Sequence, residues 1–418
     1  MRRTLPLLAG ALAFGLTLTA CGGTEPEDSS APSGTRSALV IWADQKRAET
    51  LKPLAEEWAA KNGVKAEVVG IAQNQQQTFT TAAQAGQGPD VMVGAHDWIG
   101  NLVQNGLIDP VQLTPEQMSG YVDVARKAVT YKGQVYGLPY AVESLVVYRN
   151  TELVPEAPET FDDLVATGRR LKDAGKVKQI VGFPVSQQDG QSGDTYHMYP
   201  LFTSGGGSLF GRNAEGDPDP GTLGVGDPAS VKAFERIAEF GEKGQGALKR
   251  SFTSDNSTAA FAAGETAFLV DGSWRLADVR KAGVKYALSP VPGFEGGEPA
   301  RSFVGVQSFF VAGKGKNKAL AQEFVTNALS TPEAARALYE AEPRTPALKS
   351  LIQEELPKDP DLARFQAAAE AGEPLPSIPQ MVAVWGPFNT LIHSVVKGEP
   401  VAPAVKAAGE AIAEQLKS

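Results

Sequence analysis

Apolar and polar residues follow two alternating periods along the chain from residue 38 to residue 106. Short runs rich in valine, leucine and isoleucine predict three β-strands, at 38–42, 64–71 and 90–93, the first of which has the composition of a buried strand. Between these runs the apolar side chains recur every three or four residues, which predicts helices at 49–61, 79–85 and 99–105. The last helix is expected to end at Gly106, because glycine is common just after a helix. Strands that alternate with helices at this spacing indicate parallel β-α-β units, with helices on the faces of a sheet.

A second region with the same alternation begins after residue 137. The pattern predicts strands at 142–148, 180–185, 266–270 and 303–311. It predicts helices at 164–174, 227–242 and 259–263, followed by a mostly helical segment after residue 311. Ser273 is placed to cap a short helix that starts at Trp274. The predicted fold class is therefore α/β, and 418 residues are enough for two or three domains.

The first twenty residues have the pattern of an export signal. A basic start precedes an apolar run at 5–19, and small residues then precede Cys21, the only cysteine of the chain. Cys21 in this context resembles the lipidated cysteine of the bacterial lipoprotein lipobox; an uncleaved anchor and an ordinary secretory signal are the alternatives. The next residues are small, polar and interrupted by proline, which predicts a flexible tether. We therefore expect a signal peptide at 1–20, lipidation at Cys21, a tether at 21–37, and an extracytoplasmic protein anchored to the cell membrane.

Charge and motifs exclude several classes of function. The formal net charge is -9 and no basic cluster is present, which argues against a nucleic-acid partner. The glycine-rich motifs that bind phosphate and the G-x-S-x-G motif of α/β-hydrolases are both absent from the sequence. His96, His197 and His393 lack the i, i+4 spacing of a helical metal site, so neither a metal nor a cofactor is expected. A pair of catalytic carboxylates for glycoside hydrolysis depends on three-dimensional distance and stays open.

Polar side chains directly follow two of the predicted strands. Asp44 comes just after the first strand, and His96, Asp97 and Trp98 come just after the third. In open α/β sheets the ligand crevice lies outside the carboxyl ends of the strands. These residues therefore predict a binding cleft at one rim of the sheet.

Seven segments occur in the order seen in one known family. They are Leu39-Val40-Ile41-Trp42, Gly88-Pro89-Asp90 with Ala95-His96-Asp97, Tyr140-Ala141-Val142-Glu143, Gly264-Glu265-Thr266-Ala267, Asp271-Gly272-Ser273-Trp274, Phe303-Val304-Gly305-Val306, and Ile378-Pro379-Gln380-Met381 with Trp385. Over about residues 38–418 the chain resembles the bacterial maltose/maltodextrin-binding proteins. These are the extracytoplasmic sugar receptors of ATP-binding-cassette (ABC) importers.

The resemblance implies a periplasmic-binding-protein-like fold, in which two discontinuous α/β lobes hold the ligand in the cleft between them. Lobe one is expected at 38–142 plus 307–355, and lobe two at 143–306 plus 356–418. The hinge crossovers would then fall near 141–144, 303–307 and 356–360. Because the ligand contacts both lobes only when they approach each other, hinge closure is the expected motion.

The resemblance also implies roles for individual acidic and basic residues. Asp97 and Glu143 match carboxylates that accept hydrogen bonds from sugar hydroxyls. Asp44 and Lys46 lie in the loop that supplies acidic and lysine contacts, although this loop is one residue shorter here. Asp194 matches an acid of the second lobe. For Asp97 the alternative role is capping of the helix predicted at 99–105.

The aromatic matches are Tyr196, Trp274 and Trp385. The two tryptophans match stacking platforms, and a pyranose offers an apolar C–H face to such a ring. The alternative is that both rings belong to the core, as expected for Trp58 from its helical spacing.

Five positions depart from the well-known maltose receptors. Gly94 stands where they carry tryptophan, Trp98 and Asn389 where they carry arginine, and Gln76 and Gln77 where they carry carboxylates. Trp98 is expected to supply, from a shifted position, the aromatic face that is absent at Gly94. Sugar binding is compatible with these changes, whereas ligand length and linkage do not follow from them.

The expected function is that of a monomeric, lipid-anchored receptor. It would bind maltose or maltodextrin-type oligosaccharides and deliver them to the permease of an ABC transporter without chemistry. One alternative is a receptor for another oligosaccharide, such as trehalose or a cyclodextrin. The alternative from another class is an anchored glycoside hydrolase, which turnover of the sugar would distinguish.

Overall fold

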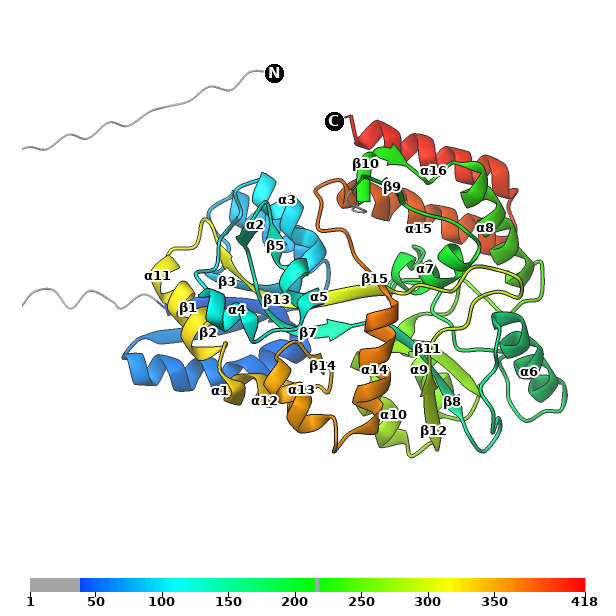
Figure 1. Cartoon of the computed structure of the whole chain (residues 1–418), viewed down its shortest axis with the longest axis horizontal. Helices are drawn as coiled ribbons and strands as arrows, with labels where there is room; N and C mark the ends of the chain where they lie inside the picture. Colours follow the sequence, from blue (N-terminus) through cyan, green and yellow to red (C-terminus); the bar gives the residue numbers. More distant parts are fainter. Residues whose placement is uncertain (1–37, 215–217, 418) are drawn as a thin grey trace, which may run out of the picture. The chain divides into compact units, whose positions relative to one another are not determined.

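The computed structural model describes residues 38–214 and 218–417 (Figure 1). The predicted signal peptide, Cys21 and the predicted tether lie outside this part. None of the helices in the described ranges has the length and hydrophobicity needed to cross a lipid bilayer. Helices and strands alternate through much of the chain, which confirms the predicted α/β class.

The larger sheet has the strand order β14-β7-β13-β3-β1-β2, with β4 and β15 also paired to β13. Its strands are β1 Ala38–Asp44, β2 Lys65–Ile71, β3 Val91–Ala95, β4 Ile108–Asp109, β7 Leu138–Glu143, β13 Phe303–Ala312, β14 Thr345–Pro346 and β15 Glu373–Pro374. As predicted, β1 is parallel to β2 and to β3. Strand β13, however, runs antiparallel to both β3 and β7, so the sheet is mixed.

Helices cover both faces of this sheet. Figure 1 shows α1, α12 and α13 on one side, and α2 and α3 on the other. The helices of this part are α1 Gln45–Asn62, α2 Gln75–Gln84, α3 Ile99–Gln104, α4 Pro115–Ser119, α5 Asp123–Ala128, α11 Lys318–Glu323, α12 Pro332–Ala341 and α13 Lys349–Glu355. A 3₁₀-helix at His96–Trp98, a π-helix at Phe324–Ala328 and a hairpin of β5 Thr130–Tyr131 and β6 Gln134–Val135 complete it.

The second sheet is antiparallel, in the order β11-β8-β12. Its strands are β8 Leu145–Asn150, β11 Phe268–Gly272 and β12 Tyr286–Ser289. The helices of this part are α6 Phe161–Asp173, α7 Thr195–Ser204, α8 Pro228–Phe240, α9 Ser254–Ala262, α10 Leu276–Ala282, α14 Pro360–Ala371, α15 Met381–Lys397 and α16 Val401–Gln415. A 3₁₀-helix at Ser273–Arg275 and a separate pair of β9 Phe210–Arg212 and β10 Pro218–Leu223 accompany them.

The buried apolar side chains form separate cores around the two sheets. One core takes its residues from 39–142 and 304–369. The other takes them from 145–303 and 375–412, and a small third cluster includes Tyr148 and Phe365. Adjacent residues of β13, Phe303 and Val304, belong to different cores, so the chain passes from one core to the other at this point.

Two predicted strands are wrong. The single strand expected at 142–148 is two strands, because Val142 pairs with Val306 of the larger sheet whereas Val147 pairs with Val270 of the smaller one. The run at 180–185 is buried but makes only one isolated bridge, from Gly182 to Leu269. A short apolar run shows that a segment is buried, but its period alone does not show how its backbone is paired.

Candidate ligand-binding site

Two adjoining cavities lie at the strand ends where the sequence predicts a cleft. The central cavity has a volume of about 640 Å³, and the side cavity about 830 Å³. The predicted residues that line the central cavity are Asp97, Glu143, Asp194, Tyr196, Trp274 and Trp385. Those that line the side cavity are Asp44, Gln76, Gln77, Trp98, Trp385 and Asn389. The two cavities share part of their lining, including Asn74 and Trp385, so they lie next to each other.

Lys46 is the predicted ligand-binding residue that lines neither cavity. Its ammonium group pairs instead with Glu342 Oε1 at 3.3 Å, and its side chain is half exposed. The first turn of α1 directs Lys46 away from the cavity, whereas Arg47, the next residue, lines it.

Asp97 lies in the turn between β3 and α3. Neither the 3₁₀-helix His96–Trp98 nor α3 has a side-chain cap, so the alternative role of Asp97 as a helix cap is wrong. Its side chain lines the central cavity, although the residue is only 8% exposed. Burial raises the pKa of Asp97 to about 7, because the charged form loses its hydration there.

His96 holds this turn in place. Its Nε2–H donates to the carbonyl oxygen of Leu375 at 2.9 Å, and its Nδ1 accepts from the amide of Val306 at 3.0 Å. The ring is fully buried, and burial lowers the pKa of His96 to about 4. This neutral histidine therefore fastens the end of β3 to β13 and to the segment before α15, and its role is structural.

Trp274 follows the end of β11, in the 3₁₀-helix Ser273–Arg275. Its ring lies back over Gly272, where a Cβ atom would come within 2.1 Å of the ring. The ring centroid of Tyr196 lies 5.9 Å away, edge to face, and the hydroxyl of Tyr196 donates at 3.3 Å to the carbonyl of Phe303. Ser273 does not cap the helix as predicted, because Gly272 occupies the cap position and the Ser273 hydroxyl is buried without a partner.

Trp385 projects from α15 and lines both cavities. Its ring meets Phe303 edge to face, with the centroids 6.3 Å apart. One helical turn later, Asn389 Oδ1 accepts from the amide of Thr195 at 3.1 Å and from its hydroxyl, so it ties α15 to α7. Gln77 of α2 also lines the side cavity, and its Nε2 donates to the hydroxyl of Thr81 at 3.3 Å.

A chain of ion pairs and hydrogen bonds, which we term the ionic network, runs along one side of the central cavity. Its members are, in order of contact, Asp44, Arg47, Gln307, Glu143, Arg344, Glu342 and Lys46. Arg47 Nη1 donates to Gln307 Oε1 at 2.7 Å, and Gln307 Nε2 donates to Glu143 Oε2 at 3.0 Å. Arg344 pairs with Glu143 Oε1 through Nη1 and with Glu342 Oε2 through Nε at 2.8 Å. Burial, assisted by the nearby Arg47, lowers the pKa of Arg344 to about 10.

Sequence reasoning missed Arg47, Gln307 and Arg344, all of which line the cavity. Arg47 had a local signal, since it lies three residues after Asp44 and pairs with it across the first turn of α1. Arg344 had none, because its partner Glu143 lies far away in the sequence and β14 is only two residues long.

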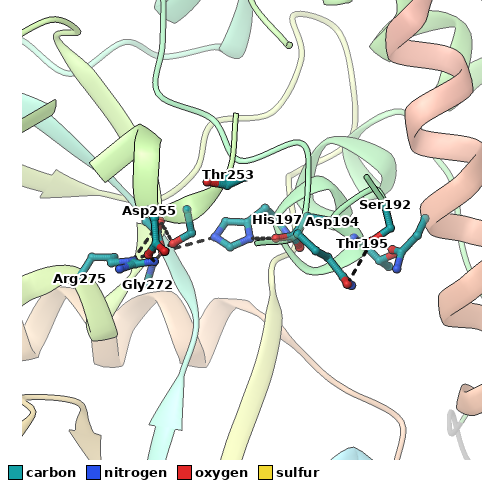
Figure 2. Close-up of polar contacts among 12 residues, drawn as sticks. Ser192, Asp194, Thr195, His197, Thr253, Asp255, Gly272 and Arg275 are labelled. Atoms are coloured by element: carbon teal, nitrogen blue, oxygen red, sulfur yellow. Dashed lines mark hydrogen bonds and ion pairs between the residues drawn. The ribbon is translucent and has the colours of Figure 1, made fainter. Parts of the chain in front are cut away.

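A second polar group centres on His197. Asp194 caps α7 by accepting from the amide of His197 at 3.1 Å, and its other oxygen meets His197 Nδ1 at 2.7 Å. On the opposite side of the ring, Nε2 lies 3.4 Å from Asp271 Oδ1. Figure 2 shows the imidazole between Asp194 on one side and Gly272, Arg275 and Asp255 on the other.

This arrangement keeps His197 protonated at neutral pH. Burial alone would lower the pKa of His197, but the carboxylates of Asp194 and Asp271 raise it to about 10. Asp194 therefore lines the cavity with its carboxylate already engaged twice by the protein. His197 was one of three histidines in the sequence, and its spacing of three residues from Asp194 is the signal that could have identified the pair.

The site combines aromatic rings with paired carboxylates and guanidinium groups around an open cavity. In the described ranges, no group of three or more His, Cys, Asp or Glu side chains is placed to hold a metal ion. Rings that can cover an apolar face, beside polar groups that fix orientation, are typical of sites that bind a small organic molecule.

The family model for bacterial extracellular solute-binding proteins matches residues 53–364, which is most of the chain. The chain belongs to this family. Its relatives include a galactooligosaccharide-binding protein of Bacillus subtilis strain 168, 28% identical over 93% of this chain and 91% of the relative. A maltodextrin-binding protein of the same organism is 27% identical over 94% of this chain and 92% of its own length. A maltooligosaccharide ABC transporter solute-binding lipoprotein of Streptococcus pneumoniae serotype 4 is 27% identical over 95% of this chain and 93% of its own length.

Proposed function

We propose that the protein is a receptor for maltodextrin-type oligosaccharides, which it binds without chemical change and delivers to an ABC importer. The observation that carries this proposal is the central cavity with Trp274, Trp385 and Asp97 in its lining. Tryptophan rings suit the C–H faces of a pyranose, and the carboxylate of Asp97 suits its hydroxyls. The names of the maltodextrin and maltooligosaccharide relatives support the same class of ligand.

The architecture proposed with this function is a pair of lobes that close on the ligand. Lobe one comprises 38–142 plus 307–355, and lobe two comprises 143–306 plus 356–418. The separate apolar cores support two lobes, and the change of core within β13 falls between Phe303 and Val304, a few residues before the proposed boundary at 306/307. Closure brings Trp274 of lobe two toward Asp97 of lobe one, which excludes water from the sugar.

Calorimetric titration against a sugar panel tests the proposed ligand class. We expect saturable binding of maltotriose or maltotetraose at a stoichiometry of one. Isomaltotriose, trehalose and β-cyclodextrin provide the comparison for linkage and shape. Failure of every α-1,4-linked glucan to bind would contradict the maltodextrin assignment.

Galactooligosaccharides are the second candidate ligands, because one relative that covers 93% of this chain is named for them. The same titration with β-1,4-galactotriose separates the two classes. Tighter binding of galactotriose than of maltotriose would replace the first proposal with this one.

The absence of catalysis is tested by turnover. Micromolar protein incubated with maltotetraose for one day should leave the sugar intact when the products are analysed by chromatography. Release of shorter sugars at more than stoichiometric yield would show a glycoside hydrolase instead. Denatured protein is the control for spontaneous hydrolysis.

We propose that Cys21 carries the lipid that holds the receptor at the membrane. One acyl chain gives only marginal membrane binding, so a diacylated cysteine is what would make the anchor stable. We expect the wild type in the membrane fraction, with globomycin-sensitive processing, and Cys21→Ala without lipid. A wild-type protein that is entirely soluble and carries an unmodified N-terminus would contradict the anchor.

A further inference from the structure

Arg344 is held on two sides and leaves part of its guanidinium group for the central cavity. Its side chain is 10% exposed, Nε donates to Glu342, and Nη1 pairs with Glu143. Its Nη2 has no hydrogen-bond partner among residues 38–214 and 218–417. The guanidinium carbon lies over the ring of Trp274, 6.0 Å from its centroid, so the two side chains together line the cavity where we place a sugar.

Glu143 retains acceptor capacity beside this donor. Its Oε1 pairs with Arg344, and its Oε2 accepts from Gln307 at 3.0 Å. Oε1 is buried, but a carboxylate oxygen carries two lone pairs, so Oε2 can accept one more hydrogen bond. Glu143 ends β7, where it is opposite Gly305 of β13, and this pairing fixes the position of its backbone. A donor and an acceptor therefore lie side by side at the cavity.

The charges of the ionic network indicate what kind of group meets this pair. The carboxylates of Asp44, Glu143 and Glu342 are matched by the cations of Lys46, Arg47 and Arg344. An anionic ligand would leave a negative charge in excess in a largely buried setting, which is costly. An uncharged hydroxyl can instead donate to Glu143 and accept from Arg344 without changing the balance.

We propose that Arg344 is a ligand-binding residue that determines specificity, and that with Glu143 it recognises one hydroxyl of the sugar unit beside Trp274. Nη2 of Arg344 donates to the hydroxyl oxygen, and the hydroxyl hydrogen is donated to Glu143. This assignment rests on the proposed function and extends it to a particular contact. A sugar that lacks this hydroxyl would leave a buried donor and a buried acceptor unpaired, which is strongly unfavourable.

The test is calorimetric titration of maltotriose and of a series of maltotrioses that each lack one hydroxyl. In the wild type, one member of the series should bind roughly 100-fold more weakly than maltotriose. In Arg344→Gln, maltotriose itself should bind at least about tenfold more weakly, and the deficit of that member should become clearly smaller, because only the contact with Glu143 remains to be lost. Arg336→Gln is the matched control, because Arg336 also pairs with two carboxylates, Glu354 and Glu355, but does not line either cavity.

Arg344→Lys distinguishes a loss of binding from a loss of folding, because lysine retains the positive charge beside Glu143 and Glu342. A lysine lacks the planar group that can span both acids and the ligand, so we expect a folded protein in which the deficit of the same deoxy sugar is also smaller than in the wild type. If both Arg344 variants weakened maltotriose and all deoxy sugars by one common factor, the residue would be structural and the assignment would be overturned. If the wild type bound no maltotriose at all, the proposed function would fail first, and the assignment with it.

Discussion

The indole ring of Trp98 occupies the space in which a side chain at Gly94 would lie. A Cβ atom added to Gly94 would come within 2.2 Å of the Cζ3 atom of that ring. Trp98 also lines the side cavity, so a single ring fills the position above β3 and borders the space proposed for ligand. The same relationship recurs at the end of β11, between Gly272 and Trp274. Each tryptophan depends on a glycine at the strand end for its place at the cavity.

Gly94→Ala should displace the Trp98 ring and destabilise the protein by about 1–3 kcal/mol, the usual cost of overpacking. The cost should be smaller in a Trp98→Ala background, because the ring that meets the new methyl group is gone. Urea unfolding of the wild type, the two single variants and the double variant measures the coupling between the two residues, as the difference between the double variant's loss of stability and the sum of the two single losses. Gly386→Ala in α15 is the control, because its Cβ would have no neighbour within 4 Å and should be neutral or slightly stabilising. Additive costs for Gly94→Ala and Trp98→Ala would contradict the contact.

Trp274→Ala and Trp385→Ala should each weaken maltotriose binding roughly thirtyfold or more, because aromatic residues in a cleft that excludes water typically contribute above ~2 kcal/mol. Their effect on unfolding should be well below the ~3–5 kcal/mol of a core tryptophan. Trp58→Ala should show the reverse, since Trp58 is 8% exposed and packs on Phe324 at 5.0 Å. Calorimetry and urea unfolding measure the two effects. Normal binding with a large loss of stability in both platform variants would assign the rings to the core.

The first half of the larger sheet could be predicted because each of its strands is a short run rich in apolar residues between helices, although only β3 is buried along most of its length. β1, β2 and β3 lie within two residues of their predicted bounds at either end. The division between β7 and β8 could not be predicted, because only Ser144 separates two buried strands that pair in different sheets. Sequence periodicity reports burial, and pairing partners are set by the tertiary structure.

In the candidate site, too, some residues could be predicted from the sequence, whereas several of their contacts could not. Asp97 and Trp98 could be placed at the rim because a strand end leads directly to them. The pairing of Glu143 with Arg344 could not, since it joins the end of β7 to the residue before β14. The second carboxylate partner of His197 is likewise determined by folding, because Asp271 reaches the ring from β11, far away in the sequence.

Ligand affinity should rise with pH between about 6 and 8 if the carboxylate of Asp97 accepts hydrogen bonds from the sugar. Burial raises the pKa of Asp97 to about 7, so the free protein carries a proton there at lower pH. Binding to the charged form must release that proton, which costs up to about tenfold in affinity per pH unit below 7. Calorimetry in two buffers of different ionisation enthalpy measures the proton released. Asp97→Asn should bind with little pH dependence; an unchanged pH profile in this variant would show that another group is responsible.

Stability should fall as pH rises from about 7 to 10, because of His197. The carboxylates of Asp194 and Asp271 outweigh burial and raise the pKa of His197 to about 10. A histidine whose pKa is raised in the folded state stabilises it fully below the unfolded pKa of about 6.5, and this contribution is lost as pH rises through the folded pKa.

His197→Gln should therefore be less stable at pH 7 by about 3 kcal/mol, the order expected when one partner of a buried ionic group is removed. Its free energy of unfolding should also decline less between pH 7 and 10 than that of the wild type. Urea unfolding at pH 7, 8.5 and 10 measures both effects. His393→Gln is the control, because partial burial lowers the pKa of His393 and its imidazole is already neutral in this range. Equal declines in the wild type and His197→Gln would mean that His197 is not the group that titrates.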